Sequence, residues 1–230
     1  MSTSPQTTSP QTTSPQKRPY RSPRREQQAV ATRVAILDAA QSLFERDGYP
    51  ATTVEAIADA VDVSTKTVYL AYASKSALLR AVWDRVLKGD TDDAPVAQRA
   101  WYQAVLAESD ARSQIGLIAA NSCTVKRRIG AMLRAIRSAS ATDADSAALW
   151  ALIQSDFHIN QRGVVEAIAR HGNLRAGLDV STATDILWTL NHPDVWLLLT
   201  GERGWSADAF ETWFRRTLTQ QLLHPSLAGD

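Results

Sequence analysis

The stretch that decides the fold is TTVEAIADAVDVSTKTVYLAYASKSALL, residues 52–79. Its apolar positions predict two short helices, at about 53–60 and 65–71, on either side of a tight turn at 62–64. A short helix, a tight turn and a second short helix have the layout of a helix-turn-helix. Layout alone is weak support, because any helical hairpin can imitate it.

Polar side chains in this stretch are placed where helices begin. Thr52 and Glu55 match a capping box at the start of the first short helix. Ser64 is a good N-cap for the second short helix, and Ser74 for the helix that follows. The sequence therefore predicts three successive helix starts within about 25 residues.

A helix-turn-helix lays its second helix in the major groove, with the N-terminal residues on base edges. The side chains available there are Thr65, Lys66, Thr67 and Tyr69. Lys66 can reach a phosphate or a guanine, and threonine offers a hydroxyl and a methyl to bases, whereas apolar Val68 should turn into the core. Helix N-termini favour phosphates, and Thr53 and Lys75 stand at two of them.

Residues 27–47, which precede this stretch, carry apolar side chains at helical spacing and predict a helix that ends near Gly48. Residues 1–16 repeat Ser-Pro-Gln-Thr-Thr with almost no apolar side chains, so we expect them to be disordered. Five cations at 17–25 form a basic arm, in which Arg24 and Arg25 are candidate DNA contacts. A solvated tail is the alternative for this arm.

Beyond Pro95 every segment again predicts helix, and no stretch alternates with period two. The expected segments are 95–109, 111–139, 143–171, 181–201 and 206–223. We expect a break inside 111–139, where Gly116 and Asn121-Ser122 interrupt the pattern, and a kink at Pro193. The prediction is an all-α fold.

Composition narrows the class of protein. The chain has 230 residues, of which 44% are hydrophobic and 21% charged, and this favours a globular protein of one or two domains. No apolar stretch reaches the ~18 residues of a membrane span, and no secretory signal is expected at the N-terminus. Cys123 is the single cysteine, so we expect a buried hydrophobe, a reducing cytoplasm and no cysteine-based metal site.

Catalytic signatures are absent from the sequence. It contains no nucleophile elbow, phosphate loop, metal-spaced histidine cluster or paired catalytic carboxylates. We therefore expect no enzyme, no metal and no cofactor. An all-helical enzyme that happens to carry a helical hairpin is the alternative.

Residues 33–88 resemble the DNA-binding domain of the TetR (tetracycline-repressor-like) family. The resemblance covers about a quarter of the chain. It is carried by Ile36-Leu37-Asp38-Ala39-Ala40, Leu43-Phe44, Gly48-Tyr49, Thr52-Thr53-Val54, Ile57-Ala58, Val63-Ser64, Thr67-Val68-Tyr69, Tyr72 and Ser74-Lys75 with Ala77-Leu78-Leu79. Glu202 to Trp205 also resemble a closing segment of some family members.

The resemblance implies a homodimer on a near-palindromic double-stranded DNA operator, with a small-molecule effector in the C-terminal domain. It implies DNA contacts from Thr53, Thr65, Lys66, Thr67, Tyr69, Tyr72 and Lys75. Packing alone is the alternative for Tyr69 and Tyr72. Asp62 stands where the family usually has glycine, but Asp tolerates left-handed geometry. Leu70 and Ala71 replace residues that often contact DNA, which shifts phosphate binding toward the arm.

Aromatic residues in the middle helices are candidates for an effector pocket. These are Trp101, Trp150, Phe157, His158 and Trp188. Core packing is the alternative for each. The apolar segments 181–200 and 206–222, with part of 143–171, are the expected dimer surface, unless they form only the subunit's own core.

These observations predict four parts of the chain. Residues 1–26 are a disordered tail and basic arm, 27–74 the three-helix DNA-binding domain, 75–94 a connecting helix and loop, and 95–230 a helical effector-binding and dimerisation domain. The expected function is a bacterial, cytoplasmic repressor that a small apolar or aromatic effector releases from its operator. A regulator controlled by a protein partner, or by no effector, is the alternative.

Overall fold

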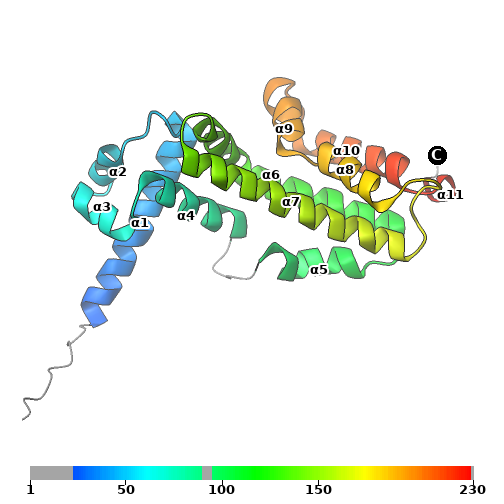
Figure 1. The fold of residues 1–230 in the computed structure, drawn as a ribbon, viewed down its shortest axis with the longest axis horizontal. Coiled ribbons are helices and arrows are strands. Elements are labelled where there is room, and N and C mark those ends of the chain that lie inside the picture. Colours follow the sequence, from blue (N-terminus) through cyan, green and yellow to red (C-terminus); the bar gives the residue numbers. More distant parts are fainter. Residues whose placement is uncertain (1–22, 90–94, 229–230) are drawn as a thin grey trace, which may run out of the picture.

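A computed structural model describes residues 23–89 and 95–228, and these residues form helices joined by short loops (Figure 1). They contain no strand beyond one isolated bridge between Leu174 and Leu223. The all-α prediction is therefore confirmed. None of the helices in the described ranges is long and apolar enough to cross a membrane. The repeated segment 1–16 and most of the basic arm lie outside the described residues.

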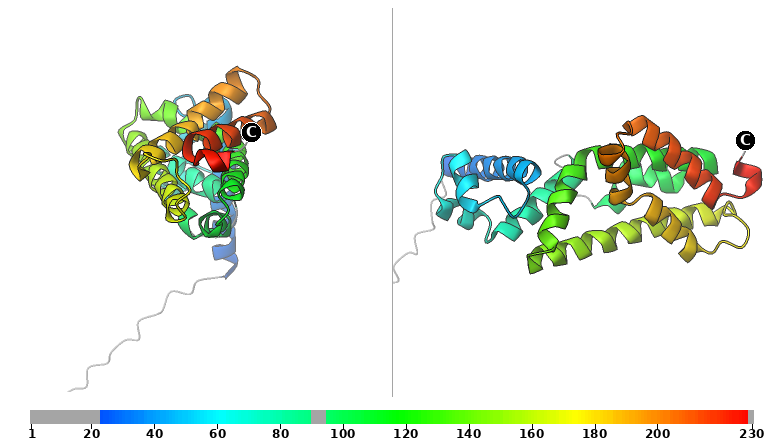
Figure 2. Two further views of the ribbon diagram at one scale, coloured as in Figure 1. Left: turned by 90° about the vertical axis from the view of Figure 1, so that its right-hand side faces the viewer. Right: turned by 90° about the horizontal axis from the view of Figure 1, so that it is seen from above.

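Four helices form the N-terminal unit at one end of the molecule (Figures 1 and 2). They are α1 (Pro23–Asp47), α2 (Val54–Ala60), α3 (Thr65–Ala71) and α4 (Lys75–Lys88). α1 begins four residues before the expected start at Gln27, with proline in the first position, where its missing N–H costs no hydrogen bond. Arg24 and Arg25 thus belong to the first turn of a helix.

The three predicted N-caps are confirmed in part. Side-chain oxygens of Thr53, Ser64 and Ser74 accept backbone N–H groups at 3.1, 3.2 and 3.0 Å. The capping box from Thr52 was wrong: this side chain is buried, and its hydroxyl donates to the carbonyl of Gly48 at 2.8 Å. Thr53 has the extended backbone that a cap requires, so it begins α2.

The turn between α2 and α3 is built on Asp62. Its backbone has φ 52°, and no other non-glycine residue in the described ranges has a positive φ. Backbone N–H groups of Val61 and Asp62 donate to the carbonyls of Ala58 and Asp59 at 3.2 and 3.3 Å. The turn therefore survives without glycine, as expected from the tolerance of Asp for this conformation.

The C-terminal part is a layered helical bundle (Figure 1). Its elements are η1 (Val96–Gln98), α5 (Ala100–Ala107), α6 (Ala111–Ser140), α7 (Ala144–Arg170), α8 (Val180–Leu190), α9 (Pro193–Trp196), the π-helical turn η2 (Leu197–Glu202), α10 (Ala207–Leu222) and α11 (Pro225–Ala228). The long helices α6 and α7 run side by side through the bundle, and α8 and α10 cover them on one side (Figures 1 and 2).

The expected break inside 111–139 was wrong, because α6 is continuous. The polar side chains of Asn121 and Ser122, where the break was expected, find partners outside α6 and do not compete for its backbone hydrogen bonds. Ser122 donates to the side-chain oxygen of Asn191 at 2.5 Å, and the Asn121 amide donates to the carbonyl of Trp101 at 3.4 Å. Gly116 lies at a site with open space around it.

Pro193 ends a helix instead of kinking one. The expected segment 181–201 divides into α8, α9 and η2, with Pro193 in the first position of α9. The ring nitrogen Nδ1 of His192 accepts the backbone N–H of Asp194 at 3.2 Å and caps this short helix. Proline offers no N–H to continue α8, so the chain restarts.

The two parts of the molecule share a core at the C-terminal half of α6. Ile129, Met132, Leu133 and Ile136 are buried against side chains of α1 and α4. The guanidinium of Arg128 donates to the carbonyls of Val86 and Leu87 at 2.8 and 2.6 Å, at the end of α4. α4 is therefore held at its C-terminus by α6.

The left-handed turn residue gives a test of stability. Replacing Asp62 by Ile should lower the free energy of unfolding by about 1–2 kcal/mol, because a β-branched side chain clashes in left-handed backbone. Asp62→Gly should not lower it. Urea unfolding measures both, and Asp59→Ile, at an exposed helical position of α2, is the control with a cost below ~0.7 kcal/mol. Equal stability of Asp62→Ile and the wild type would contradict this account.

Candidate nucleic-acid interface and ligand cavity

The exposed face of α3 presents most of the predicted reading residues. Lys66 is exposed, Tyr69 is 50% exposed, and Thr65 and Thr67 are half-buried. Val68 is buried, as predicted. The hydroxyl of Thr67 lies 2.9 Å from that of Ser64, so it is partly engaged within the turn.

Leu70 is a surface residue that the sequence reasoning undervalued. Its side chain is 77% exposed beside Tyr69. The resemblance to the TetR family marked this position only as one where a residue that often contacts DNA is replaced. An apolar side chain on a reading helix can contact a thymine methyl group. Helical spacing in the sequence predicts this exposure, because Leu70 lies two positions from buried Val68 and therefore on the outer face of the helix.

Tyr72 and Lys75 are held by contacts within the protein. The Tyr72 hydroxyl donates to the carbonyl of Arg33 at 3.3 Å, and the Arg33 guanidinium lies 5.0 Å from the ring centre. The Lys75 ammonium donates to the carbonyl of Tyr49 at 2.5 Å and lies 4.1 Å from its ring centre. Burial raises the pKa of Tyr72 and lowers that of Lys75.

The other predicted contacts lie at helix starts. Thr53 is exposed at the start of α2, where its oxygen caps the helix. Arg24 is exposed in the first turn of α1, and the side chain of Arg25 lies outside what the structure describes.

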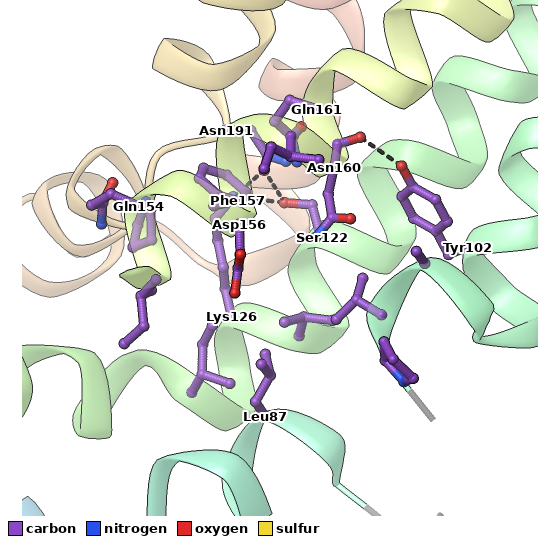
Figure 3. Close-up of a pocket in the computed structure, with 18 of the residues that line it drawn as sticks. Leu87, Tyr102, Ser122, Lys126, Gln154, Asp156, Phe157, Asn160, Gln161 and Asn191 are labelled. Atoms are coloured by element: carbon purple, nitrogen blue, oxygen red, sulfur yellow. Dashed lines mark hydrogen bonds between the residues drawn. The ribbon is translucent and has the colours of Figure 1, made fainter. Parts of the chain in front are cut away.

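A second feature is a cavity of about 430 Å³ that lies between α4, α5, α6 and α7 and is partly open to solvent (Figure 3). Its wall is mostly apolar, with Trp83 and Leu87 from α4, Trp101 from α5, Ile129 from α6 and Phe157 from α7. This volume lies in the range of small-molecule sites. The residues from α4 tie the cavity to the helix that follows α3.

Two of the five aromatic residues predicted for a pocket lie in this wall, Trp101 and Phe157. Trp150, His158 and Trp188 do not line it. Trp150 packs near Arg137, while His158 lies 3.2 Å from Asp185 and contacts the Trp188 ring. Neighbouring positions of a helix point ~100° apart, so Phe157 and His158 face different surroundings.

Polar side chains gather at one side of the cavity. The ammonium of Lys126 donates to the hydroxyl of Ser122 at 2.6 Å and to the side-chain oxygen of Asn191. The Asn191 amide donates to the side-chain oxygen of Gln161 at 3.0 Å. Figure 3 shows these labelled residues on α6, on α7 and just beyond α8. Helical periodicity indicates only which positions are buried, so it did not identify Lys126 as part of a cavity wall.

Burial changes the protonation of Lys126. Its side chain is 4% exposed, and desolvation lowers its pKa to about 7. The rings of Phe210 and Phe214 lie 5.1 and 5.3 Å from the ammonium and give it partial compensation. Lys126 is therefore balanced between its charged and neutral forms near neutral pH.

Metal and thiol chemistry find little support among the described residues. They contain no group of three or more His, Cys, Asp or Glu side chains that could hold a metal ion. Cys123 is buried, and burial raises the pKa of its thiol to about 11. This agrees with its expected role as a small core residue.

Comparisons with known proteins agree with this geometry. Residues 36–82 match the family model described as bacterial regulatory proteins, tetR family. The chain is 26% identical over 162 residues to the uncharacterized HTH-type transcriptional regulator YdeS of Bacillus subtilis strain 168, covering 68% of this chain and 74% of YdeS.

Solved structures share the fold. A putative transcriptional regulator from Saccharomonospora viridis, in complex with choline, matches with TM-score 0.65 and 18% identity over 84% of this chain and 98% of that one. NalD of Pseudomonas aeruginosa, the secondary repressor of the MexAB-OprM multidrug efflux pump, matches with TM-score 0.65 and 20% identity over 85% and 98%.

The buried lysine predicts a pH-dependent stability difference. Between its folded pKa of about 7 and the ordinary ~10.4 the unfolded chain binds more protons, so the wild type gains stability as pH rises. Relative to Lys126→Met, the gain should be about 1.4 kcal/mol per pH unit in this window, with no change below pH ~7. Urea unfolding at several pH values measures it.

The matched control is Arg127→Met, which removes the neighbouring exposed cation of α6. Its stability difference from the wild type should stay flat across the same window. A flat difference for Lys126→Met as well would show that Lys126 keeps an ordinary pKa.

Proposed function

We propose that this chain is a repressor that a small apolar or aromatic effector releases from a near-palindromic operator. The match of residues 36–82 to the TetR family of transcriptional regulators supports this proposal. The observation that carries the proposal is the cavity of about 430 Å³, whose wall includes residues of α4. A ligand in this cavity would contact the helix that directly follows the reading helix. We further propose that the chain is not an enzyme and acts in the cytoplasm.

Helix α4 is the proposed lever between ligand and DNA. Its first turn lies beside α3, where Ser76 also donates to Asp145 of α7 at 2.9 Å. Its last turns carry Trp83 and Leu87 into the cavity wall, and Arg128 holds its final carbonyls. A ligand that displaces this end would move the reading helix with it, because a helix transmits displacement as a rigid rod.

The proposed DNA contacts divide into reading and positioning groups. Lys66, Tyr69 and the newly noted Leu70 are exposed on α3 and would face bases in the major groove. Thr53 and Arg24 are exposed at helix starts and would contact phosphates, which position the protein without reading sequence. Lys75 and Tyr72 would have to leave their internal partners to touch DNA.

A homodimer through α8 and α10 would complete the operator-binding form. These helices lie together on one side of the bundle (Figure 1). Ile186 and Leu190 line a shallow groove between them, beside Thr217. Two such helix pairs make a four-helix interface under two-fold symmetry, which would set the two α3 helices about 34–36 Å apart, or a multiple of that.

The relatives add support from outside the chain. The Saccharomonospora viridis neighbour is described with choline bound, and NalD is described as a repressor of an efflux pump. Both share the fold of this chain, so the fold is compatible with a bound small molecule and with repression.

The reading helix gives a direct test. Lys66→Ala should weaken operator binding and reduce the slope of log affinity against log salt by about 0.9 if Lys66 neutralises a phosphate. If it reads a guanine instead, the loss of about 1–3 kcal/mol should be confined to sequences with that base. Fluorescence anisotropy with selected operator DNA at several salt concentrations measures both.

Arg127→Ala, at an exposed position of α6 outside the proposed dimer helices, is the matched control and should leave affinity and slope unchanged. Unchanged binding by Lys66→Ala would remove α3 from the interface.

Filling the cavity tests the effector. Val125 is half-buried in the cavity wall, and Val125→Trp should exclude ligands while leaving operator affinity within about twofold. The apolar dye N-phenyl-1-naphthylamine should bind the wild type saturably, and binding should be lost in this variant. Dye fluorescence and operator anisotropy measure the two effects.

Ala120→Trp places the same side chain on the exposed face of α6 and should behave as the wild type. Dye binding unaffected by Val125→Trp would reject this cavity as the site, and would favour control by a protein partner or by no effector.

A further inference from the structure

Lys126 is a buried cation whose hydrogen-bond partners are all neutral. Its ammonium donates to the hydroxyl of Ser122 and the amide oxygen of Asn191, and the rings of Phe210 and Phe214 lie beyond. No carboxylate of the described residues forms an ion pair with it. A buried charge without a counter-ion is strongly unfavourable, so the arrangement calls for an anion.

Ionisable groups on the surrounding helices do not supply that anion. On α10, Glu211 lies near Cys123, and on α7, Asp156 is exposed at the cavity wall. On α4, Asp84 is paired with Arg80 at 3.1 Å, again at the wall.

The other charged groups near Lys126 pair with one another. Arg127 pairs with Asp208, and Arg137 pairs with Asp194. His192 is kept neutral, because burial lowers its pKa and its Nδ1 accepts a backbone N–H. Lys126 thus has no fixed negative charge opposite it.

The rest of the wall complements an apolar body. Trp83, Trp101, Ile129 and Phe157 are apolar or aromatic residues that line the cavity together with the polar cluster of Ser122, Lys126, Gln161 and Asn191. Of the two cations in the wall, Arg80 pairs with Asp84, so Lys126 alone offers an unpaired positive charge to a ligand. The wall therefore combines a long apolar surface with a single anionic subsite.

We propose that the cavity takes an amphipathic carboxylate, with its apolar chain among the aromatic and aliphatic side chains and its head on Lys126, Ser122 and Asn191. This rests on the proposed function, in which the same cavity is the effector site. The carboxylate would supply the missing counter-ion, and the Ser122 hydroxyl and the Asn191 amide could reorient toward it.

Calorimetry with three matched probes tests the charge. Decanoate, 1-decanol and decylamine share a chain but carry a negative, neutral or positive head. Decanoate should bind at least tenfold more tightly than 1-decanol at pH 6.5, and decylamine should bind more weakly than 1-decanol. Equal affinity of decanoate and 1-decanol would overturn the proposal.

The pH dependence gives a signature that a merely structural lysine would not produce. Decanoate stays ionised from pH 6.5 to 8.5, while free Lys126 loses its proton around pH 7. Affinity for decanoate should therefore fall on the order of 20-fold over this range, with proton uptake at pH 8.5, and affinity for 1-decanol should stay constant. A pH-independent decanoate affinity would overturn the proposal without any variant.

Lys126→Met should bind decanoate no better than 1-decanol, at either pH. Arg127→Met removes an adjacent exposed cation and should bind both probes as the wild type does. Undiminished decanoate binding by Lys126→Met would overturn the proposal.

Operator release is measured separately, so the two proposals can fail independently. Lys126-dependent decanoate binding without operator release would support the carboxylate site and count against effector control. Tight binding of 1-decanol that releases the operator would support effector control and count against the carboxylate site.

Discussion

Helix α4 packs into the core of the helix-turn-helix with one part and lines the cavity with another, and this is the central constraint in the structure. One part of the helix packs Leu78, Leu79 and Val82 into the core of the helix-turn-helix. The other part presents Trp83 and Leu87 to the cavity, and Arg128 of α6 binds its last carbonyls. Packed protein interiors switch between discrete arrangements and do not deform continuously. A structural change at either end of α4 therefore requires the side chains at the other end to repack.

The C-terminal half of α6 extends this constraint. It packs against α1 and α4 through Ile129, Met132 and Ile136, and one turn earlier it carries Lys126 at the cavity. The same helix therefore supports the reading unit, closes the end of α4 and provides the polar subsite. The proposed coupling between ligand and DNA needs no long chain of contacts, because side chains of α4, the helix that follows α3, themselves line the cavity.

The proposed DNA-binding site and the proposed ligand site differ in the surroundings of their lysine side chains. The reading helix presents Lys66 to solvent, where its charge is fully hydrated and available for phosphate. Lys126 has the same functional group in apolar surroundings, where burial lowers its pKa to about 7. The difference in environment, not in side chain, is the reason why we propose Lys66 as a DNA contact and Lys126 as part of a ligand site.

The local structure of this protein follows from its amino-acid sequence alone. Helical periodicity, the N-caps at Ser64 and Ser74 and the left-handed tolerance of Asp62 depend on residues close in the chain, so α2, α3 and α4 were predictable within a few residues. The residues that line the cavity, in contrast, depend on how the helices pack in three dimensions. Trp101 and Phe157 face it whereas Trp150, His158 and Trp188 do not, and Lys126 lies in its wall. Periodicity reports which face of a helix is buried, but the neighbours that meet that face come from distant helices whose packing no local pattern encodes.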